Sequence, residues 1–386
     1  MMEVVKVSEN IISPLGFSVE ENYEAVMSGK SALRLYEGLW GLPFPFVASM
    51  LDDSLLDDEF RKCADVSRLP YGNFTRFEKA ALLSAIKALE SASVDTESAR
   101  TLFILSTTKG NVELLGGGSP SLARVRLAST ASMISRYFRN PNQPIVVSNA
   151  CISGLCAQIE AMRCIRSGHY DCCVVTGADV LSPFIVSGFN CLKALSDEPC
   201  RPFSANRKGL NLGEAAATVV YSASGSDSRQ WRIASGAVRN DANHISGPSR
   251  TGDGSFAALD YAVRHSGCLP SDLAFLNVHG TATPYNDEME SVAIGRAGLA
   301  DVPVNALKGY YGHTLGAAGV LEVLLSMHSV EQGVILPTRG FDTLGVSVNL
   351  NVSDQPVETC KKSFAKLLSG FGGCNAAAVF TKSGKS

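Results

Sequence analysis

Long apolar runs, charge of one sign and paired cysteine motifs are scarce in this sequence. No stretch of 18 apolar residues occurs and no N-terminal signal segment is recognisable, so we expect no membrane insertion. The 34 basic and 37 acidic residues give a net charge of -3, which does not favour nucleic acid as a partner. Eleven cysteines are spread without a CxxC motif, a pattern typical of free thiols in a reducing cytoplasm.

Glycine motifs that bind phosphate are also missing. The glycine cluster Gly116–Gly118 is not followed by a Walker lysine, and no GxGxxG motif follows a strand pattern. The sequence therefore predicts no nucleotide site. Residues 29–65, which are rich in aromatic residues and acid pairs, are predicted to form an irregular loop.

The segment 149–168 carries the strongest chemical signal. It begins Asn-Ala-Cys-Ile-Ser-Gly, follows a β-branched run and continues with Ala, Leu, Ile and Met. This pattern predicts a buried strand that runs into a buried helix, with Cys151 at the junction. The first turn of a helix has unpaired N–H groups and a positive dipole end, so we expect an acidified, nucleophilic thiol. The alternative is a buried structural cysteine, the commoner role of an isolated one.

An internal repeat divides the chain into two halves. The segment Gly213–Tyr221 resembles Gly373–Thr381, and each closes its half with a strand. The segment around Cys151 has a counterpart in 304–322, where a strand pattern again precedes a helix of small residues. Alternation of strands and helices in both halves predicts an α/β fold made of duplicated units, whose buried helices pack together between sheets.

The boundary between the two halves is predicted near Gly225–Arg229. The first half, 1–225, carries the cysteine, and the second half, 226–386, carries the histidines discussed next. Where such halves meet, strand ends and helix starts converge, so groups that are distant in the sequence can face one pocket.

Two of the six histidines lie in contexts that suggest chemistry. His279 ends an apolar strand pattern and opens the sequence Gly-Thr-Ala-Thr, whereas His313 lies in the glycine-rich sequence Gly-Tyr-Tyr-Gly-His-Thr-Leu-Gly. We expect both to face Cys151 from the second half. A structural histidine with satisfied hydrogen bonds is the alternative for each.

Together these motifs resemble those of an elongating β-ketoacyl-[acyl-carrier-protein] synthase, a decarboxylating condensing enzyme of the thiolase superfamily. The matching segments, in order, are Asn149–Gly154, Arg201–Phe203, Gly209–Glu214, Asn240–His244, His279–Thr283, Lys308–Glu322 and Gly370–Asn375. The resemblance implies a thiolase-like fold in αβαβα layers. It also implies that an acyl group on Cys151 condenses with malonyl-acyl carrier protein to give 3-ketoacyl-acyl carrier protein and CO2, in fatty-acid or polyketide biosynthesis.

The same resemblance assigns roles to single residues. Cys151, His279, His313 and Lys308 form the implied catalytic set, and the backbone N–H groups of Cys151 and Phe371 the oxyanion hole, with Phe371 also as the gate. Further roles are support of the site by Glu322, Asp287 and Glu290, substrate binding by Thr281, Thr283 and Ser369, and contact with the carrier protein by Lys193.

The resemblance implies no metal and no cofactor beyond the phosphopantetheine that carries the substrates. It implies an acyl carrier protein as partner, and a homodimer or a heterodimer with a chain-length partner. Ser369 stands where the family usually has an aromatic residue, which indicates a specialised synthase. The sequences Val147–Gly154 and Gly209–Glu214 resemble those of synthases of aryl polyene or resorcinol-type pathways. A mainly decarboxylating or chain-length subunit remains an alternative. A thiolase is disfavoured because Cys374 lacks the thiolase Cys-x-Gly context.

Overall fold

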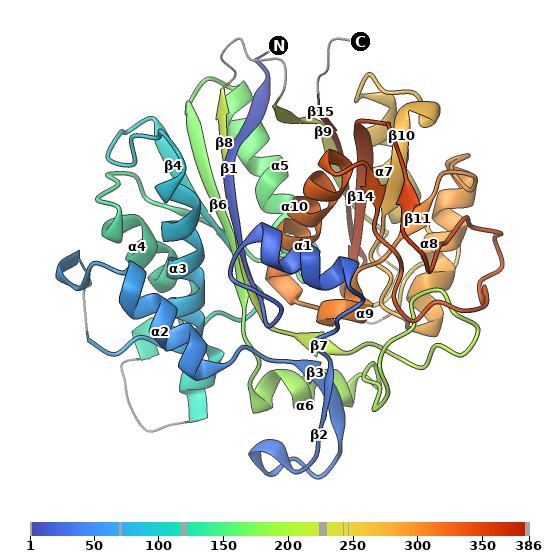
Figure 1. Cartoon of the computed structure of the whole chain (residues 1–386), viewed down its shortest axis with the longest axis horizontal. Helices are drawn as coiled ribbons and strands as arrows, with labels where there is room; N and C mark the ends of the chain where they lie inside the picture. Colours follow the sequence, from blue (N-terminus) through green and yellow to red (C-terminus); the bar gives the residue numbers. More distant parts are fainter. Residues whose placement is uncertain are drawn as a thin grey trace.

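The computed structural model describes residues 2–68, 72–116, 122–223, 230–241, 243–245 and 247–382. The boundary predicted near 225–229 lies outside them, as do the last two glycines of the cluster 116–118. The described chain forms alternating layers of helices and sheet (Figure 1). None of its described helices combines the length and apolarity that crossing a bilayer requires.

The two halves have equivalent sheets. The first contains β1 (Val4–Ile12), β4 (Thr101–Ser106), β5 (Ile145–Val147), β6 (Cys172–Asp179) and β8 (Ala215–Ala223), and the second contains β9 (Trp231–Asn240), β10 (Leu273–Asn277), β11 (Val304–Asn305), β14 (Ser363–Gly370) and β15 (Cys374–Lys382). The strand orders are β5-β4-β6-β8-β1 and β11-β10-β14-β15-β9. In each sheet the first three strands are parallel to one another, and the last two pairings are antiparallel. The pair Val5–Arg232 joins them edge to edge. This correspondence bears out the repeat seen in the sequence.

Most helices lie in three layers around these sheets, and α6 lies below them in the view (Figure 1). They are α1 (Val19–Met27), α2 (Asp53–Cys63), α3 (Arg76–Glu90), α4 (Leu127–Tyr137), α5 (Ser153–Arg166), α6 (Pro183–Cys191), α7 (Asp253–Arg264), α8 (Pro284–Arg296), α9 (Lys308–Tyr311) and α10 (Ala318–Glu331). Helices α2–α4 cover the first sheet, α7 and α8 cover the second, and α5 and α10 lie between the sheets. This αβαβα arrangement confirms the fold that the resemblance implied.

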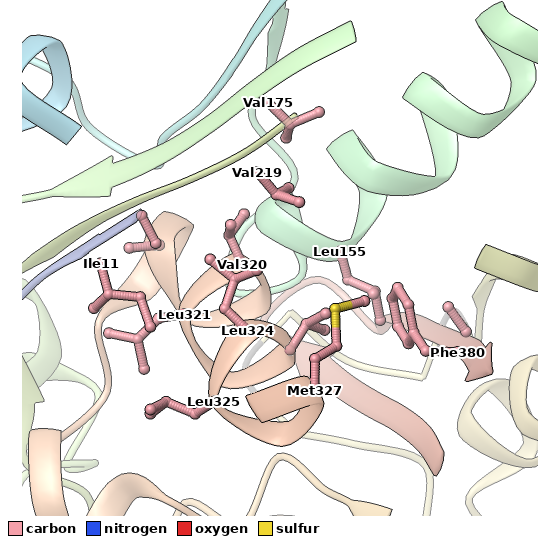
Figure 2. Packing of buried hydrophobic residues seen from close by; sticks show 14 of the residues in the cluster. Ile11, Leu155, Val175, Val219, Val320, Leu321, Leu324, Leu325, Met327 and Phe380 are labelled. Atoms are coloured by element: carbon pink, nitrogen blue, oxygen red, sulfur yellow. The ribbon is translucent and has the colours of Figure 1, made fainter. Parts of the chain in front are cut away.

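The two central helices approach each other through glycines. A Cβ at Gly319 would lie 2.3 Å from the backbone nitrogen of Leu155, and one at Gly154 would lie 2.8 Å from the carbonyl oxygen of Gly316. Val320 and Leu324 of α10 pack in the apolar core between the sheets (Figure 2). The small residues therefore bring the N-terminal ends of α5 and α10, and the loops before them, close together.

The prediction of a loop over 29–65 is wrong. The segment contains α2 and two short strands, β2 (Arg34–Tyr36) and β3 (Phe46–Ser49), and β3 pairs with β7 (Leu212–Gly213). The α2 helix begins after Asp52, whose side chain caps the Leu55 amide, and it buries Leu56 and Phe60. Only two residues of α2 are fully buried, and so narrow an apolar face does not stand out among its acidic residues.

Candidate active site

The junction between β5 and α5 holds Cys151 as the sequence predicted. Ala150 has a φ of 42°, a left-handed conformation that a residue with a Cβ rarely adopts. The hydroxyl of Ser153 stabilises the turn because it donates to the Ala150 carbonyl at 2.6 Å and accepts from the Asn149 amide at 2.8 Å. The sharp turn directs Cys151 to the cavity described below, although the residue is buried, with only 5% of its surface accessible.

The structure brings Cys151, His279 and His313 together from the two halves. The Cys151 sulfur and one ring nitrogen of each histidine all lie within 4.8 Å of one another. The imidazole rings are 5.0 Å apart between centroids and nearly perpendicular, at 84°. All three residues are buried. The predicted convergence of the halves on one pocket is therefore confirmed.

The expectation that Cys151 is acidified is wrong for the free protein. Burial raises the pKa of its thiol to about 12, and Cys374 contributes to the increase. Lys308 and a backbone hydrogen bond from Phe371 act in the opposite direction without cancelling it. Desolvation of a thiolate in this buried pocket thus outweighs the effect of the helix start. At neutral pH the Cys151 side chain is therefore a thiol.

Both imidazoles are held neutral. Burial lowers the pKa of His279 and of His313 well below the ordinary value, and the charges of Lys308 and Lys366 lower it further. The Nδ1 atom of His313 accepts from the Leu315 amide at 3.3 Å, so its proton is on Nε2. Within the described part of the chain that Nε2 has no partner. It is a buried donor available to a substrate oxygen.

A buried charge cluster lies behind the histidines. Glu322 of α10 accepts from the Lys308 ammonium at 2.9 Å and from the Lys366 ammonium of β14. Burial raises the pKa of the Glu322 carboxyl, but these two lysines hold that pKa below its ordinary value. A thiol and two imidazoles are groups that bind transition metals. The two lysines outnumber Glu322, however, and their net positive charge opposes a divalent cation. Glu322, for which the resemblance implied a supporting role, is thus paired with Lys308, whereas no role was predicted for Lys366.

The carboxyls of Asp287 and Glu290 hold the backbone of the turn after His279. Glu290 accepts from the amides of His279 at 2.7 Å and Gly280 at 2.8 Å, and Asp287 accepts from those of Phe203 at 2.8 Å and Ala282 at 3.2 Å. Burial raises the pKa of Glu290 to about 7 and that of Asp287 to about 6. These contacts favour the supporting role predicted for both residues.

A second backbone clamp was missed at Asp179. It accepts from the Thr107 hydroxyl at 2.7 Å, the Thr108 amide at 2.9 Å and the Gly316 amide at 2.7 Å, and so ties the first half to the loop after His313. Its only signal in the sequence was a lone acid at the end of an apolar strand.

A cavity of about 500 Å³ opens over these groups. Its buried lining residues include Cys151, His279, Thr281, His313 and Ser369, and its exposed ones include Leu192, Lys193, Lys208, Ile245 and Tyr285. The substrate-binding and carrier-contact residues predicted from the sequence thus share one cavity. The Thr281 and Thr283 hydroxyls are 2.9 Å apart on its wall.

The predicted gate borders the same cavity. The Phe371 ring lies 5.8 Å from that of Phe189, between centroids, and the chain after it turns through Gly372 and Gly373, both at positive φ. Ser369 is buried and donates to the Asn375 side chain at 2.7 Å. The small serine leaves space in the cavity wall at the position where an aromatic residue was expected from the resemblance.

Comparisons with known proteins agree with this geometry. The family models for the β-ketoacyl synthase N-terminal and C-terminal domains match residues 2–224 and 232–342. The chain is 28% identical over 417 residues to 3-oxoacyl-[acyl-carrier-protein] synthase 2 of Vibrio cholerae, covering 98% of this chain and 99% of that one. It is 33% identical over 253 residues to the tetracenomycin polyketide synthase ketoacyl synthase alpha subunit of Streptomyces glaucescens, covering 61% and 59%.

A solved structure, "The ishigamide ketosynthase/chain length factor", superposes with a TM-score of 0.88 at 25% identity, covering 99% of this chain and 100% of that one. A buried cysteine that faces two neutral histidines between duplicated α/β halves defines a condensing enzyme of the thiolase-like fold. The chain belongs to the β-ketoacyl synthase family, whose members are acyltransferases.

Proposed function

We propose that the cavity catalyses a decarboxylative Claisen condensation in which Cys151 holds the acyl group and His279 and His313 activate a malonyl thioester. The observation that carries the proposal is the group of one thiol and two neutral imidazoles within 4.8 Å. Membership of the β-ketoacyl synthase family supports the same reaction. The products are 3-ketoacyl-acyl carrier protein and CO2.

Acyl transfer comes first. The Cys151 sulfur attacks the thioester carbonyl of an acyl-carrier protein, and its proton passes to the neighbouring imidazole. The backbone N–H groups of Cys151 and Phe371 donate to the oxyanion, and each lowers the barrier by about 3 kcal/mol. The bond to the carrier sulfur then breaks, and the leaving thiolate takes the proton from the imidazole. The acyl group is now on Cys151 and both imidazoles are neutral again.

Condensation follows when a malonyl thioester enters. Imidazole N–H groups of His279 and His313 donate to its thioester oxygen, the bond to the carboxylate breaks, and CO2 leaves with the electron pair retained as an enolate. The enolate carbon attacks the acyl carbonyl, the bond to the Cys151 sulfur breaks, and the thiolate takes a proton from solvent. A buried positive charge at Lys308, paired with Glu322, favours the anionic enolate.

The arrangement of the cavity suits substrates held on phosphopantetheine. The Thr281 and Thr283 hydroxyls can bind its amides, and Phe371 can move to admit the acyl chain. Lys193 and Lys208 are exposed where the cavity opens, as an acidic carrier protein requires. No additional cofactor is needed for these steps. The eleven free cysteines support a cytoplasmic location, where thiols stay reduced.

The quaternary state is inferred from similarity to solved structures. The similarity to a ketosynthase/chain length factor structure supports a second thiolase-like subunit as partner, in a homodimer or a heterodimer. A role as mainly decarboxylating or chain-length subunit is the second candidate, but the intact set of Cys151, His279, Lys308 and His313 favours the condensing role. The space left by Ser369 fits a specialised acyl chain, and the aryl polyene or resorcinol-type pathway remains a prediction.

Mass spectrometry tests the proposal directly. The protein is incubated with a panel of acyl-carrier proteins and then with malonyl-carrier protein, with Cys151→Ala as the control. We expect acyl adducts on Cys151 that disappear as the 3-ketoacyl product forms, and none in the variant. Malonyl decarboxylation without any adduct on Cys151 would contradict the condensing role and support the partner-subunit candidate.

A further inference from the structure

The second lysine of the buried cluster has no part in the steps above. Lys366 lies on β14 and is fully buried, as is its contact with Glu322 of α10. Its ammonium also donates to the carbonyl of Val278 at 3.3 Å, the residue directly before His279. A lysine is rarely buried in a strand unless it is paired, and pairing with Glu322 duplicates what Lys308 already does. The second lysine therefore calls for a separate explanation.

We propose that Lys366 is a positioning residue of the condensing site, which acts through Glu322 and the Val278 carbonyl to keep a positive charge in excess behind His279 and His313. This rests on the proposed function. Burial lowers the pKa of Lys366 to about 8. Below that pH two ammonium groups share one carboxylate, so the cluster carries one net positive charge. With Lys308 alone the cluster would be neutral.

The surroundings of Lys366 contain few other charges. On the neighbouring strand β15 it is in register with Ala378, and β10 places Asn277 beside it, both uncharged. The charged groups that act on its ammonium are Glu322 of α10, Lys308 of α9 and, more weakly, Glu290 of α8. Burial raises the pKa of Glu290 to about 7, which limits its negative charge. The charges of Lys308 and Lys366 are also the lysine charges that lower the pKa of both His279 and His313.

The excess charge has a chemical consequence. An imidazole beside a cation binds a proton less readily, and only a neutral imidazole can serve both as proton acceptor for Cys151 and as hydrogen-bond donor to the enolate oxygen. Lys366 thus extends the pH range in which His279 and His313 are competent toward acid. The contact with the Val278 carbonyl also fixes the strand end that carries His279.

Charge-changing variants test this role through the pH dependence of kcat/KM for condensation. The quantity compared is the position of the acid limb, the pH range in which kcat/KM falls as the pH is lowered. Lys366→Met removes the excess charge, and we expect the limb to move up by about one pH unit. The double variant Lys366→Met/Glu322→Gln restores one net positive charge, and the limb should return toward the wild-type position. Lys382→Met, on β15 with an outer partner Glu331, is the control and should leave the profile unchanged.

A second comparison serves if Lys366→Met does not fold, as loss of a buried partner can cause. In Glu322→Gln the cluster has two uncompensated positive charges, whereas in the double variant it has one. The acid limb should therefore lie at a higher pH in the double variant than in Glu322→Gln. Direct titration of His279 and His313 by NMR of histidine-labelled protein should follow the same order. An unchanged limb in folded Lys366→Met, or a shift that persists in the double variant, would overturn the proposal. If the wild-type protein does not catalyse condensation at any pH, that result would instead contradict the proposed function.

Discussion

The two halves of the molecule have the same strand order but present different chemistry at equivalent places. In the first half the chain enters α5 through a strained turn that carries Cys151. In the second half it enters α10 through a short helix and a turn that carry Lys308 and His313. The crossing at Gly154 and Gly319 brings these two entrances together. Duplication thus provides the positions, and in the proposed mechanism the loop of the first half supplies the nucleophile while the loop of the second half supplies hydrogen-bond donors.

The largest expected effect separates the chemistry of the two halves. His313→Asn retains an acceptor for the Leu315 amide through Oδ1 but removes the donor at Nε2. We expect malonyl decarboxylation to fall by about 10²-fold or more, because one hydrogen bond to the enolate is lost. Cys151→Ala should abolish condensation but retain decarboxylation. Equal loss of decarboxylation in both variants, measured as CO2 release, would show that the halves do not divide the work in this way.

The crossing of the central helices can be broken at one glycine. Gly319→Ala places a Cβ against the backbone nitrogen of Leu155, at 2.3 Å, so α5 and α10 must separate. We expect the free energy of unfolding to fall by about 3 kcal/mol, measured by urea denaturation. The control Gly188→Ala, on the exposed side of α6 with no atom within 4 Å of its Cβ, should be neutral or slightly stabilising. Similar stability of the two variants would contradict the close crossing.

Alkylation tests whether the start of α5 acidifies its cysteine. Since burial raises the pKa of Cys151 to about 12, the thiolate fraction should rise about tenfold per pH unit throughout pH 6 to 9. The rate at which iodoacetamide modifies the peptide containing Cys151, followed by mass spectrometry, should increase without a plateau. Cys151→Ala identifies the background from other thiols. A plateau near neutral pH would mean that the helix start outweighs desolvation.

The smallest expected effect concerns the cavity wall in the second half. Ser369→Phe fills space beside the acyl site, so kcat/KM for long acyl-carrier substrates should fall by about tenfold while short ones are less affected. Ser369→Ala removes only the hydrogen bond to Asn375 and should retain the wild-type chain-length preference. Competition between short and long acyl-carrier proteins measures both. An unchanged preference in Ser369→Phe would show that this position does not limit chain length.

The sequence was informative where chemistry requires particular residues in order. The internal repeat predicted duplicated α/β halves that converge on one pocket. The ordered motifs around Cys151, His279 and His313 carried the resemblance that implied the αβαβα layers. Helix α2 was missed because its buried face has only Leu56 and Phe60. The short strand β3 was missed because it forms against β7, which is distant in the sequence.

The sequence by itself determined which residues could serve as nucleophile and hydrogen-bond donors, because those roles depend on residue type and local pattern. Only the tertiary structure decided their protonation. Burial of Cys151 reversed the pKa shift expected from the helix start, and packing of β14 against α10 placed Lys366 in the charge cluster. Desolvation and charge balance depend on neighbours contributed by separate strands and helices, so no local pattern contains them.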